Sequence, residues 1–378
     1  MNVLVSLVFQ LLLEIWRRII KENPRCSYQA IEKIADYYRS GAGKQQTLAE
    51  NRQAFYKYKI RPRCLRNVEN VDLSTTILGE KISMPIGIAP TAMQKMAHPL
   101  GECANARAAQ ELGTIFTLST LSTSSIEEVA EAAPQAIKWY QLYIYKDRNI
   151  TRDLVIRAEK AGFKALVLTV DAPVFGLRLE DLRNKFTLPS HLRLANFQGI
   201  KSGMNTERDH ESGLNNYVTS LFDSSINWED LKWLKSITKL PIVLKGILTA
   251  EDALLGVQAG VAAIQVSNHG ARQIDGTVAA IDALSEIVKA VGDKIEVYMD
   301  GGVTDGVDIL KAVALGARMV FIGRPALWGL THSGQAGVEQ ILNILKKELI
   351  TCMAIAGFSN IKEIDRNLVV HENYYSKL

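Results

Sequence analysis

The chain has 378 residues, of which 47% are hydrophobic and 22% are charged, and its formal net charge is +4. This composition is typical of a globular protein with a large core. The sequence has no basic block with interleaved aromatic residues, which argues against nucleic acid as a partner. The cysteines are widely separated and show no metal-ligand spacing, so we expect reduced thiols and no metal site. They are Cys26, Cys64, Cys103 and Cys352.

Residues 1–75 are expected to form a helical segment that packs on the main domain. Within this segment, Val3–Leu13 is strongly apolar but falls short of the roughly 20 residues that span a bilayer. No positive residue precedes this run and no small-residue cleavage site follows it, as a signal peptide requires. We expect a helix that packs on the body or on a partner, with anchoring at a membrane surface as the alternative.

Eight short apolar runs, bounded by polar residues or glycine, predict buried strands. They are Pro85–Ala89, Thr114–Leu118, Ile137–Tyr143, Ala165–Val170, Pro241–Lys245, Ala262–Val266, Ile295–Met299 and Met319–Gly323. Apolar residues at a spacing of three and four predict helices between most of them, at Leu100–Leu112, Ser124–Ala133, Arg148–Ala161, Ala250–Ala259, Val278–Val291 and Gly306–Leu315. This alternation predicts an α/β protein with a (β/α)8 barrel over residues 76–365, and a doubly wound open sheet is the structural alternative.

Two further segments stand out by composition. Residues 174–226, between the fourth and fifth predicted strands, are polar, and we interpret them as a mobile lid over the barrel mouth. For the middle of this loop, a disordered insertion without a role is the alternative. Residues 366–378 form a tail that ends in Ser376-Lys377-Leu378, the tripeptide bound by the peroxisomal import receptor, which predicts a peroxisomal location.

The most informative string is Ser267-Asn268-His269-Gly270-Ala271-Arg272-Gln273, which follows the sixth predicted strand. The carboxyl ends of parallel strands are where α/β folds place their chemistry. A histidine takes a proton near neutral pH, and an arginine binds a carboxylate. Together they predict an enzyme that removes a proton from an acid-bearing substrate.

Polar residues or glycines follow the other predicted strands as well. In chain order they are Pro90-Thr91-Ala92, Ser119, Gln141 and Tyr143, Thr169 and Asp171, Lys245, Asp300-Gly301-Gly302, and Gly323-Arg324. A barrel mouth that binds a polar cofactor and an acid accounts for this set. The glycine-rich turns after the last two strands are a frequent phosphate site in barrels.

The string Ser267–Gln273 resembles, letter for letter, the active-site signature of the FMN-dependent 2-hydroxy acid oxidase and dehydrogenase family, which includes glycolate oxidase. The resemblance runs from about Ile31 to about Ile364 and includes Thr47–Arg52, Gln141–Tyr143 and Phe321–Pro325. It implies FMN as cofactor, an (S)-2-hydroxy acid and O2 as substrates, H2O2 as a product, and a homo-oligomer, expected to be a tetramer. A dehydrogenase or lactate monooxygenase of the same family, and a catalytically impaired flavin-binding protein, are the alternatives.

The resemblance also implies a role for each site residue. His269 would be the base, Asp171 would stabilise the imidazolium, and Lys245 would sit by the flavin N1/O2 edge and stabilise the reduced ring. The substrate would be held by Arg272, Arg178, Tyr37 and Tyr143. The cofactor would be held by Pro90, Thr91, Ala92, Ser119, Gln141, Thr169, Ser267, Asp300, Gly301, Gly302, Gly323 and Arg324. On the residues alone, Tyr37 could simply stack in the N-terminal segment, and Arg178 could be a solvated lid charge.

Two positions depart from the family pattern. Leu121 stands where glycolate oxidase has a tryptophan that narrows the pocket, so we expect medium- or long-chain 2-hydroxy acids, or lactate-like ones, as substrates. Thr304 stands where the family usually has an arginine on the FMN phosphate, and Asp305 adds a negative charge beside it. We therefore expect weaker retention of FMN.

Overall fold

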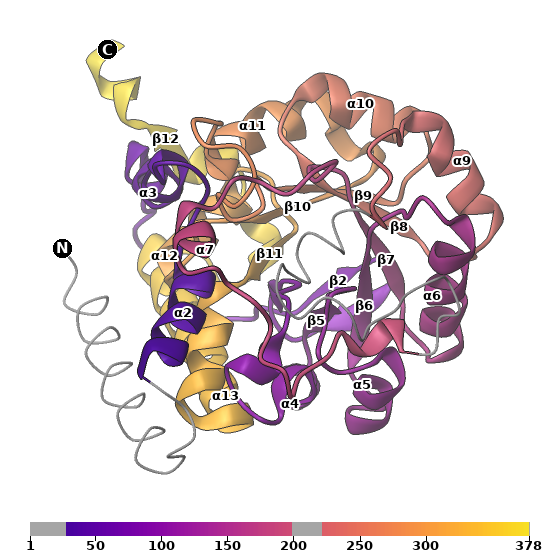
Figure 1. Cartoon of the computed structure of the whole chain (residues 1–378). Helices are drawn as coiled ribbons and strands as arrows, with labels where there is room; N and C mark the ends of the chain where they lie inside the picture. Colours follow the sequence, from indigo (N-terminus) through magenta and orange to yellow (C-terminus); the bar gives the residue numbers. More distant parts are fainter. Residues whose placement is uncertain (1–27, 199–220, 378) are drawn as a thin grey trace.

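The computed structural model describes residues 28–198 and 221–377 (Figure 1). The predicted helix at Val3–Leu13, the middle of the predicted lid and Leu378 lie outside the described residues. No helix in the described part of the chain combines the length and the apolar character that crossing a bilayer requires.

Eight parallel strands close into a barrel in the order β10-β11-β4-β5-β6-β7-β8-β9. The first barrel strand in the chain, β4, pairs with the last one, β11, through Gly87 and Phe321. This closure confirms the predicted (β/α)8 barrel and rules out the open sheet. The strands are β4 Ile86–Ile88, β5 Ile115–Leu118, β6 Ile137–Leu142, β7 Ala165–Thr169, β8 Ile242–Ile247, β9 Ala263–Val266, β10 Glu296–Asp300 and β11 Met319–Ile322.

A helix follows each barrel strand, and together these helices surround the barrel (Figure 1). They are α4 Gly101–Glu111, α5 Ile126–Ala132, α6 Arg148–Lys160, α9 Trp228–Ser236, α10 Ala250–Gln258, α11 Ala280–Val291, α12 Gly306–Ala314 and α13 Arg324–Ala356. Helix α13 changes direction at Ser333 and Gly334, whose backbone angles are not helical. Helices α9 and α13 are not among the six that the periodicity predicted, whereas those six are all present.

The interior of the barrel below its carboxyl end is filled with side chains. Trp139, Tyr298 and Phe321 meet there, with ring centroids 5.4–6.0 Å apart. The antiparallel hairpin of β2 (Thr75–Ile77) and β3 (Glu80–Ile82) adds apolar side chains to the same cluster. Close packing of large aromatic side chains leaves no passage here, so access to the barrel comes from the carboxyl end.

The residues before the barrel contribute α2 (Tyr28–Arg39), α3 (Gln46–Gln53) and β1 (Tyr58–Ile60). Strand β1 pairs antiparallel with β12 (Val369–His371), so the two flanking segments of the barrel are hydrogen-bonded to each other. The division into segments at residues 75 and 365 stays a prediction. The remaining elements are α7 Leu179–Arg183 and the 3-10 turns Ala54–Lys57, Gln94–Met96, Ala195–Phe197, Gly292–Lys294, Ile361–Glu363, Arg366–Leu368 and Glu372–Lys377.

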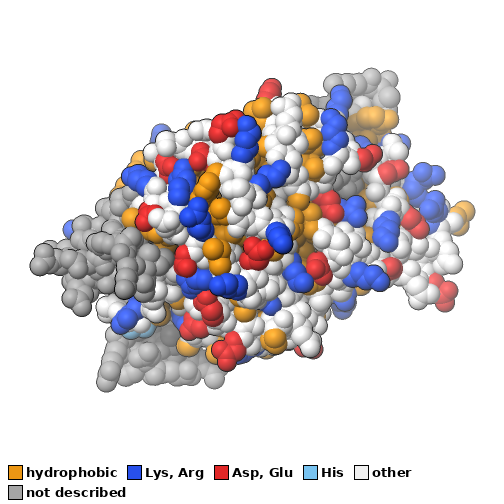
Figure 2. Space-filling model, turned by 90° about the vertical axis from the view of Figure 1, so that its right-hand side faces the viewer, with side chains coloured by type: hydrophobic (Ala, Val, Ile, Leu, Met, Phe, Trp, Pro, Cys, Tyr) orange, Lys and Arg blue, Asp and Glu red, His pale blue; other side chains and the backbone are white. Residues whose placement is uncertain are grey.

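The surface carries charges of both signs. On the face that Figure 2 presents, acidic and basic side chains are interspersed, and neither sign gathers into a continuous patch.

The cysteines of the described residues are unpaired. Cys64, Cys103 and Cys352 are free thiols. Within residues 28–198 and 221–377, no three His, Cys, Asp or Glu side chains lie together as a metal site would need.

Candidate active site

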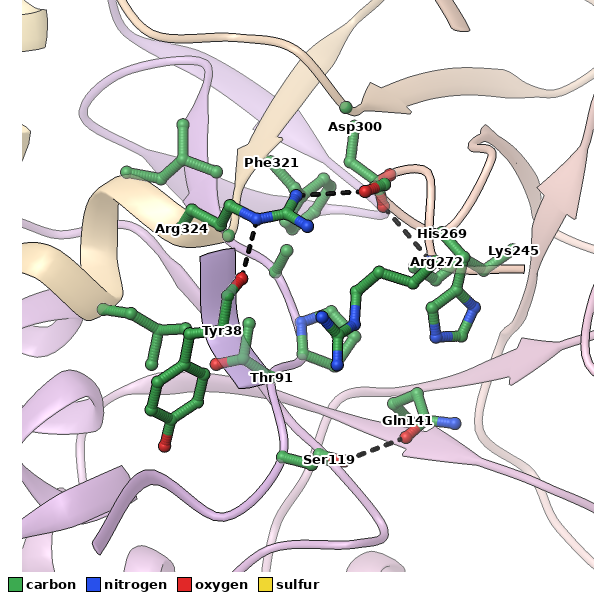
Figure 3. A pocket seen from close by; sticks show the side chains of 18 of the residues that line it. Tyr38, Thr91, Ser119, Gln141, Lys245, His269, Arg272, Asp300, Phe321 and Arg324 are labelled. Carbon is green, nitrogen blue, oxygen red and sulfur yellow. Dashed lines mark hydrogen bonds and ion pairs between the residues drawn. The ribbon is translucent and has the colours of Figure 1, made fainter. Parts of the chain in front are cut away.

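A cavity of about 340 Å3 opens at the carboxyl end of the barrel, which is within the size range of cofactor pockets. Figure 3 shows labelled side chains from separate strand ends around this space, among them Thr91, Gln141, Lys245 and Arg272. Of the predicted site residues, all but Asp171 and Ser267 line the cavity. Those two hydrogen-bond to residues of the wall.

The histidine of the signature is held by a strained turn. His269, Gly270 and Ala271 all have a positive φ, between 58° and 62°, which non-glycine residues rarely adopt. The side chain of Asn268 stabilises this turn because its Oδ1 accepts a hydrogen bond from the backbone N–H of Ala271 at 3.2 Å. Asn268 is itself fixed by reciprocal amide hydrogen bonds of 2.7 and 2.9 Å with Asn51 of α3. The turn is therefore positioned by two elements far apart in the sequence.

His269 and Asp171 form an acid–base pair. The Nδ1 atom of His269 lies 2.9 Å from Oδ1 of Asp171, and the His269 side chain is 19% exposed. Burial lowers the pKa of His269, and nearby Lys245 and Arg178 add to this effect while Asp171 opposes it. Burial alone would raise the pKa of Asp171, but the facing His269 and Lys245 outweigh it and hold that pKa below its ordinary value. The pair thus consists of a neutral imidazole and a carboxylate at neutral pH, with Nε2 of the ring left to accept a proton.

Lys245, on β8, provides a buried positive charge near the His269–Asp171 pair. Its ammonium group donates to Oγ of Ser267 at 2.9 Å and lies 3.4 Å from Oδ2 of Asp300. Ser267 in turn donates to the other carboxylate oxygen of Asp300 at 2.5 Å. Gln265 donates to Asp300 as well, at 2.7 Å. This network fixes Lys245 and leaves its charge close to the cavity.

Gln141 connects three strand ends by buried hydrogen bonds. Its Oε1 accepts from the backbone N–H of Thr120 at 3.1 Å and from Oγ of Ser119 at 3.4 Å, and its Nε2 donates to Oγ1 of Thr169 at 3.0 Å. Each of these side chains lies on the cavity wall or next to it. The wall therefore presents fixed donors and acceptors, as recognition of a planar heterocycle requires.

Arginines bring an excess of positive charge to the cavity. Arg272 donates to the backbone carbonyls of Tyr37 and Ser40 at 2.6 and 3.0 Å, and Arg324 donates to those of Tyr38, Gly270 and Ser40 at 2.8–3.0 Å. Burial and the neighbouring like charges lower the pKa of Arg272 to about 10 and that of Arg324 to about 9. Among the described residues, neither has a carboxylate within ion-pair distance. Buried cations without anions favour binding of anionic groups.

Arg178 belongs to the same group but is tied to the long connection after β7. Its guanidinium lies 3.8 Å from Oδ2 of Asp181 and 5.6 Å from the ring centroid of Phe175. Its side chain is only 10% exposed. The alternative of a solvated lid charge is therefore wrong for Arg178.

Two tyrosines of the cavity are fixed by aromatic stacking. Tyr37 stacks on Phe186 with centroids 4.4 Å apart, and the guanidinium of Arg272 lies 4.8 Å from the Tyr37 centroid. Tyr143 stacks on Phe222, also at 4.4 Å. Burial raises the pKa of Tyr143, and the nearby Asp171 adds to this, so its hydroxyl stays a hydrogen-bond donor at neutral pH.

Part of the cavity lining is apolar. It includes Leu121, Phe175 and Leu194, and the last two come from the long connection after β7. Asn196 holds this part of the connection in place because its amide donates to the carbonyl of Thr120 at 3.0 Å and its Oδ1 accepts from the N–H of Ile126 at 2.9 Å. Sequence reasoning identified Leu121 but missed Phe175 and Leu194. No pattern in the polar connection indicates which of its residues fold back over the cavity.

The glycine turn after β10 packs tightly against α3. A Cβ atom on Gly302, whose φ is +79°, would lie 2.2 Å from the backbone carbonyl oxygen of Asn51. Arg52 follows Asn51 and lines the cavity beside Gly302 and Thr304. Sequence reasoning did not assign a role to Asn51 or Arg52, although both stand in the string Thr47–Arg52 that carried the family resemblance.

Comparison with known proteins agrees with this geometry. Residues 27–371 match the family model of the FMN-dependent dehydrogenases. The chain belongs to this family. It is 54% identical to 2-hydroxyacid oxidase 1 of Homo sapiens over 340 residues, which covers 89% of this chain and 92% of the relative. It is also 54% identical to glycolate oxidase of Spinacia oleracea over 346 residues, 90% of this chain and 93% of the relative.

A solved structure of mandelate oxidase with (S)-4-hydroxymandelic acid shares the fold, with a TM-score of 0.86 and 39% identity over 95% of this chain and 98% of that one. The protein is therefore an FMN-dependent oxidoreductase with the barrel fold of this family. The cavity suits the cofactor, because it combines fixed hydrogen-bonding groups at the ends of β5–β7 with a buried ammonium group. Its unpaired arginine Arg324 and its close-packed Gly302 are suited to a phosphate.

Proposed function

We propose that this cavity oxidises (S)-2-hydroxy acids to 2-oxo acids and passes the electrons to O2, with FMN as the cofactor. The juxtaposition of a neutral His269, held by the Asp171 carboxylate, with the positively charged Arg272 and Arg178 supports the proposal most strongly. The relatives named 2-hydroxyacid oxidase and glycolate oxidase support it as well. When bound, FMN supplies the acceptor for the two electrons that leave the substrate.

His269 acts as the base. Since Nδ1 is engaged by Asp171, Nε2 is the atom that takes the substrate proton. The imidazolium that forms lies 2.9 Å from a carboxylate in a buried site, where a charge-assisted hydrogen bond stabilises it strongly. Asp171 therefore lowers the barrier by stabilising charge that develops on the ring.

Arg272 and Arg178 bind the substrate carboxylate, and Tyr37 and Tyr143 donate hydrogen bonds to the acid. Arg272 is fixed before the substrate arrives, because two backbone carbonyls already hold its guanidinium. Preorganisation of this kind orients the α-carbon without a further entropic cost at the moment of reaction. The arginines thus determine which face of the acid meets His269.

The polar wall would hold the cofactor. Lys245 would place its positive charge beside the flavin ring, where it would stabilise the reduced form. Thr91, Ser119, Gln141, Thr169 and Ser267 would provide hydrogen bonds to the ring or support those that do, and Pro90 and Ala92 would pack beside it. The phosphate would be held at the ends of β10 and β11. Gly301, Gly302, Gly323 and Arg324 would contact it there, beside Asp300, whose carboxylate is engaged by Ser267, Gln265 and Lys245.

The preferred acid carries an apolar tail. Leu121, Phe175 and Leu194 offer an apolar wall where a larger aromatic side chain at position 121 would fill the space. Each buried methylene group contributes about 0.8 kcal/mol, so kcat/KM should rise about threefold to fourfold per added carbon until the wall is filled. Steady-state oxygen uptake with acids from glycolate to long-chain members tests this, and a higher kcat/KM for glycolate than for the longer acids would refute it.

Two further assignments concern the cell and the assembly. Ser376-Lys377-Leu378 is proposed as the signal bound by the peroxisomal import receptor, which suits an oxidase that releases H2O2. Deletion of the tripeptide should leave the protein outside peroxisomes, whereas an unchanged location would refute the signal. A homotetramer is proposed as the assembly, and light scattering of the holoenzyme measures its mass directly.

A further inference from the structure

The phosphate end of the cavity contains a cation whose charge is held by acidic side chains. Arg52 lines the cavity beside Gly302 and Thr304, and its Nη2 lies 2.8 Å from Oδ2 of Asp305. Its Nη1 bonds Oδ2 of Asp308. The guanidinium is 25% exposed, so it is neither fully solvated nor sealed in the core. Arg52 therefore borders the cavity, but both of its terminal nitrogens already bond carboxylates.

The two carboxylates have different structural duties. Asp308 is 4% exposed and accepts a hydrogen bond from the backbone N–H of Thr304 at 3.0 Å, so it shapes the loop after β10. Asp305 is 34% exposed and is the N-cap of α12, where Oδ1 accepts from the N–H of Asp308 at 3.0 Å. Only one of its oxygens is needed for the cap. The other one engages Arg52.

The positive charge of Arg52 is already offset at this end of the cavity. Arg52 interacts with two carboxylates, and the buried Lys311 interacts with the same two carboxylates. Burial, and to a lesser extent the neighbouring Asp305, raise the pKa of Asp308 to about 6, although Arg52 opposes the shift. A phosphate that enters the loop after β10 therefore meets an Arg52 whose charge is already engaged by Asp305 and Asp308, and Thr304 adds no further cation there.

We propose that Asp305 competes with the FMN phosphate for Arg52 and thereby keeps the cofactor exchangeable. This inference rests on the proposed placement of the phosphate at the ends of β10 and β11. When Asp305 no longer engages Arg52, the free Nη2 of the guanidinium is available to the phosphate. Asp305 is thus a residue that weakens cofactor retention, and Arg52 is the residue through which it acts.

The test uses Asp305→Asn, which removes the charge but keeps a side chain that caps helices as well as aspartate does. The full chain, freed of flavin and titrated with FMN, should bind it about tenfold more tightly in the variant, as expected when the freed Arg52 makes one further charge-assisted hydrogen bond to the phosphate. Quenching of flavin fluorescence on binding gives the dissociation constant without any measurement of turnover. An unchanged or weaker FMN affinity in Asp305→Asn overturns the proposal.

Two controls separate the possible reasons for failure. Riboflavin lacks the phosphate, so its affinity should not respond to Asp305→Asn, and a tenfold gain for riboflavin as well would overturn a phosphate-specific role. In the Arg52→Gln background, the gain from Asp305→Asn should shrink to less than about twofold, because the pair acts as a unit. If wild-type protein binds riboflavin as tightly as FMN, the proposed placement of the phosphate fails, which is a result distinct from failure of the competition.

Discussion

Replacement of Asp171 by asparagine tests how much the carboxylate contributes to proton removal. The substitution keeps the size of the side chain but removes the charge that faces His269 Nδ1 at 2.9 Å. A buried charge-assisted hydrogen bond contributes about 2–4 kcal/mol to the stability of the imidazolium formed at the transition state. The rate of the chemical step should therefore fall by a factor of about 30 to 1,000.

The pH profile of Asp171→Asn adds a second, independent readout. Activity requires neutral His269, and burial already lowers its pKa, so the acidic limb of kcat/KM in the wild type should lie below pH ~6.5. Asp171 raises the pKa of His269, so its loss should move that limb to still lower pH while the plateau falls. Rapid anaerobic mixing of the flavin-loaded protein with acid gives the rate of flavin bleaching at each pH.

A matched control carries the same chemical change at a carboxylate that contacts a cavity residue. Asp181→Asn alters a carboxylate 3.8 Å from Arg178, so it should change KM and leave the acidic limb in place. A bleaching rate within about threefold of wild type in Asp171→Asn, or a limb that moves to higher pH, would refute the role of Asp171. Equal FMN content in both variants excludes a simple loss of structure.

Four further substitutions test other parts of the site. Leu121→Trp should fill the apolar wall and shift kcat/KM towards glycolate by at least about tenfold, measured by oxygen uptake with the acid series. Lys245→Met should retain FMN but slow its bleaching by about a hundredfold, and an unchanged bleaching rate would contradict the role of this charge. Gly302→Ala places a methyl group 2.2 Å from the carbonyl oxygen of Asn51, so we expect a loss of about 2 kcal/mol or more in unfolding free energy together with loss of FMN, read by denaturant titration and flavin absorbance. Glu102→Gln removes a buried carboxylate that accepts hydrogen bonds from the loops after β4 and β5, and a fall in Tm, corresponding to about 1.5–3 kcal/mol, is the expected result in thermal unfolding.

The barrel could be predicted from the sequence because its strands are buried on both faces. Runs such as Ala165–Val170 read as continuous apolar segments, and the structure confirms each of them as a barrel strand. Helix α9 was missed because it follows the long polar connection directly, and its start at Asn227 is marked by a capping box rather than by a long apolar stripe. Helix α13 was missed because it begins at Arg324, and Gly323-Arg324 had been interpreted as part of a glycine-rich turn that binds phosphate.

Much of the candidate site was also accessible, since a closed barrel brings all its strand ends to one mouth. His269, Lys245 and Arg324 could be placed there from strand ends alone. The side chains that act from outside the barrel could not. Arg52 contacts Asp305, which lies 253 residues further along the chain, and no local pattern reports such a contact.

The sequence also shows no sign of the buried carboxylate that holds the loops after β4 and β5. Glu102 lies within a predicted helix and reads as an ordinary surface charge, yet it is fully buried. Its oxygens accept from the backbone N–H groups of Gln94 and Thr123 at 2.9 and 2.8 Å, which ties together the loops that carry Thr91 and Ser119. Burial of this kind follows from tertiary packing and not from periodicity.

The most direct test of the proposed function is anaerobic bleaching of the FMN-loaded protein by a series of (S)-2-hydroxy acids, followed by admission of air. We predict that acids with apolar tails bleach the flavin fastest, and that its absorbance recovers in air with one H2O2 formed for each 2-oxo acid. Bleaching that persists in air would contradict O2 as the acceptor and favour a dehydrogenase. No bleaching with any acid, despite bound FMN, would contradict the proposed oxidation itself.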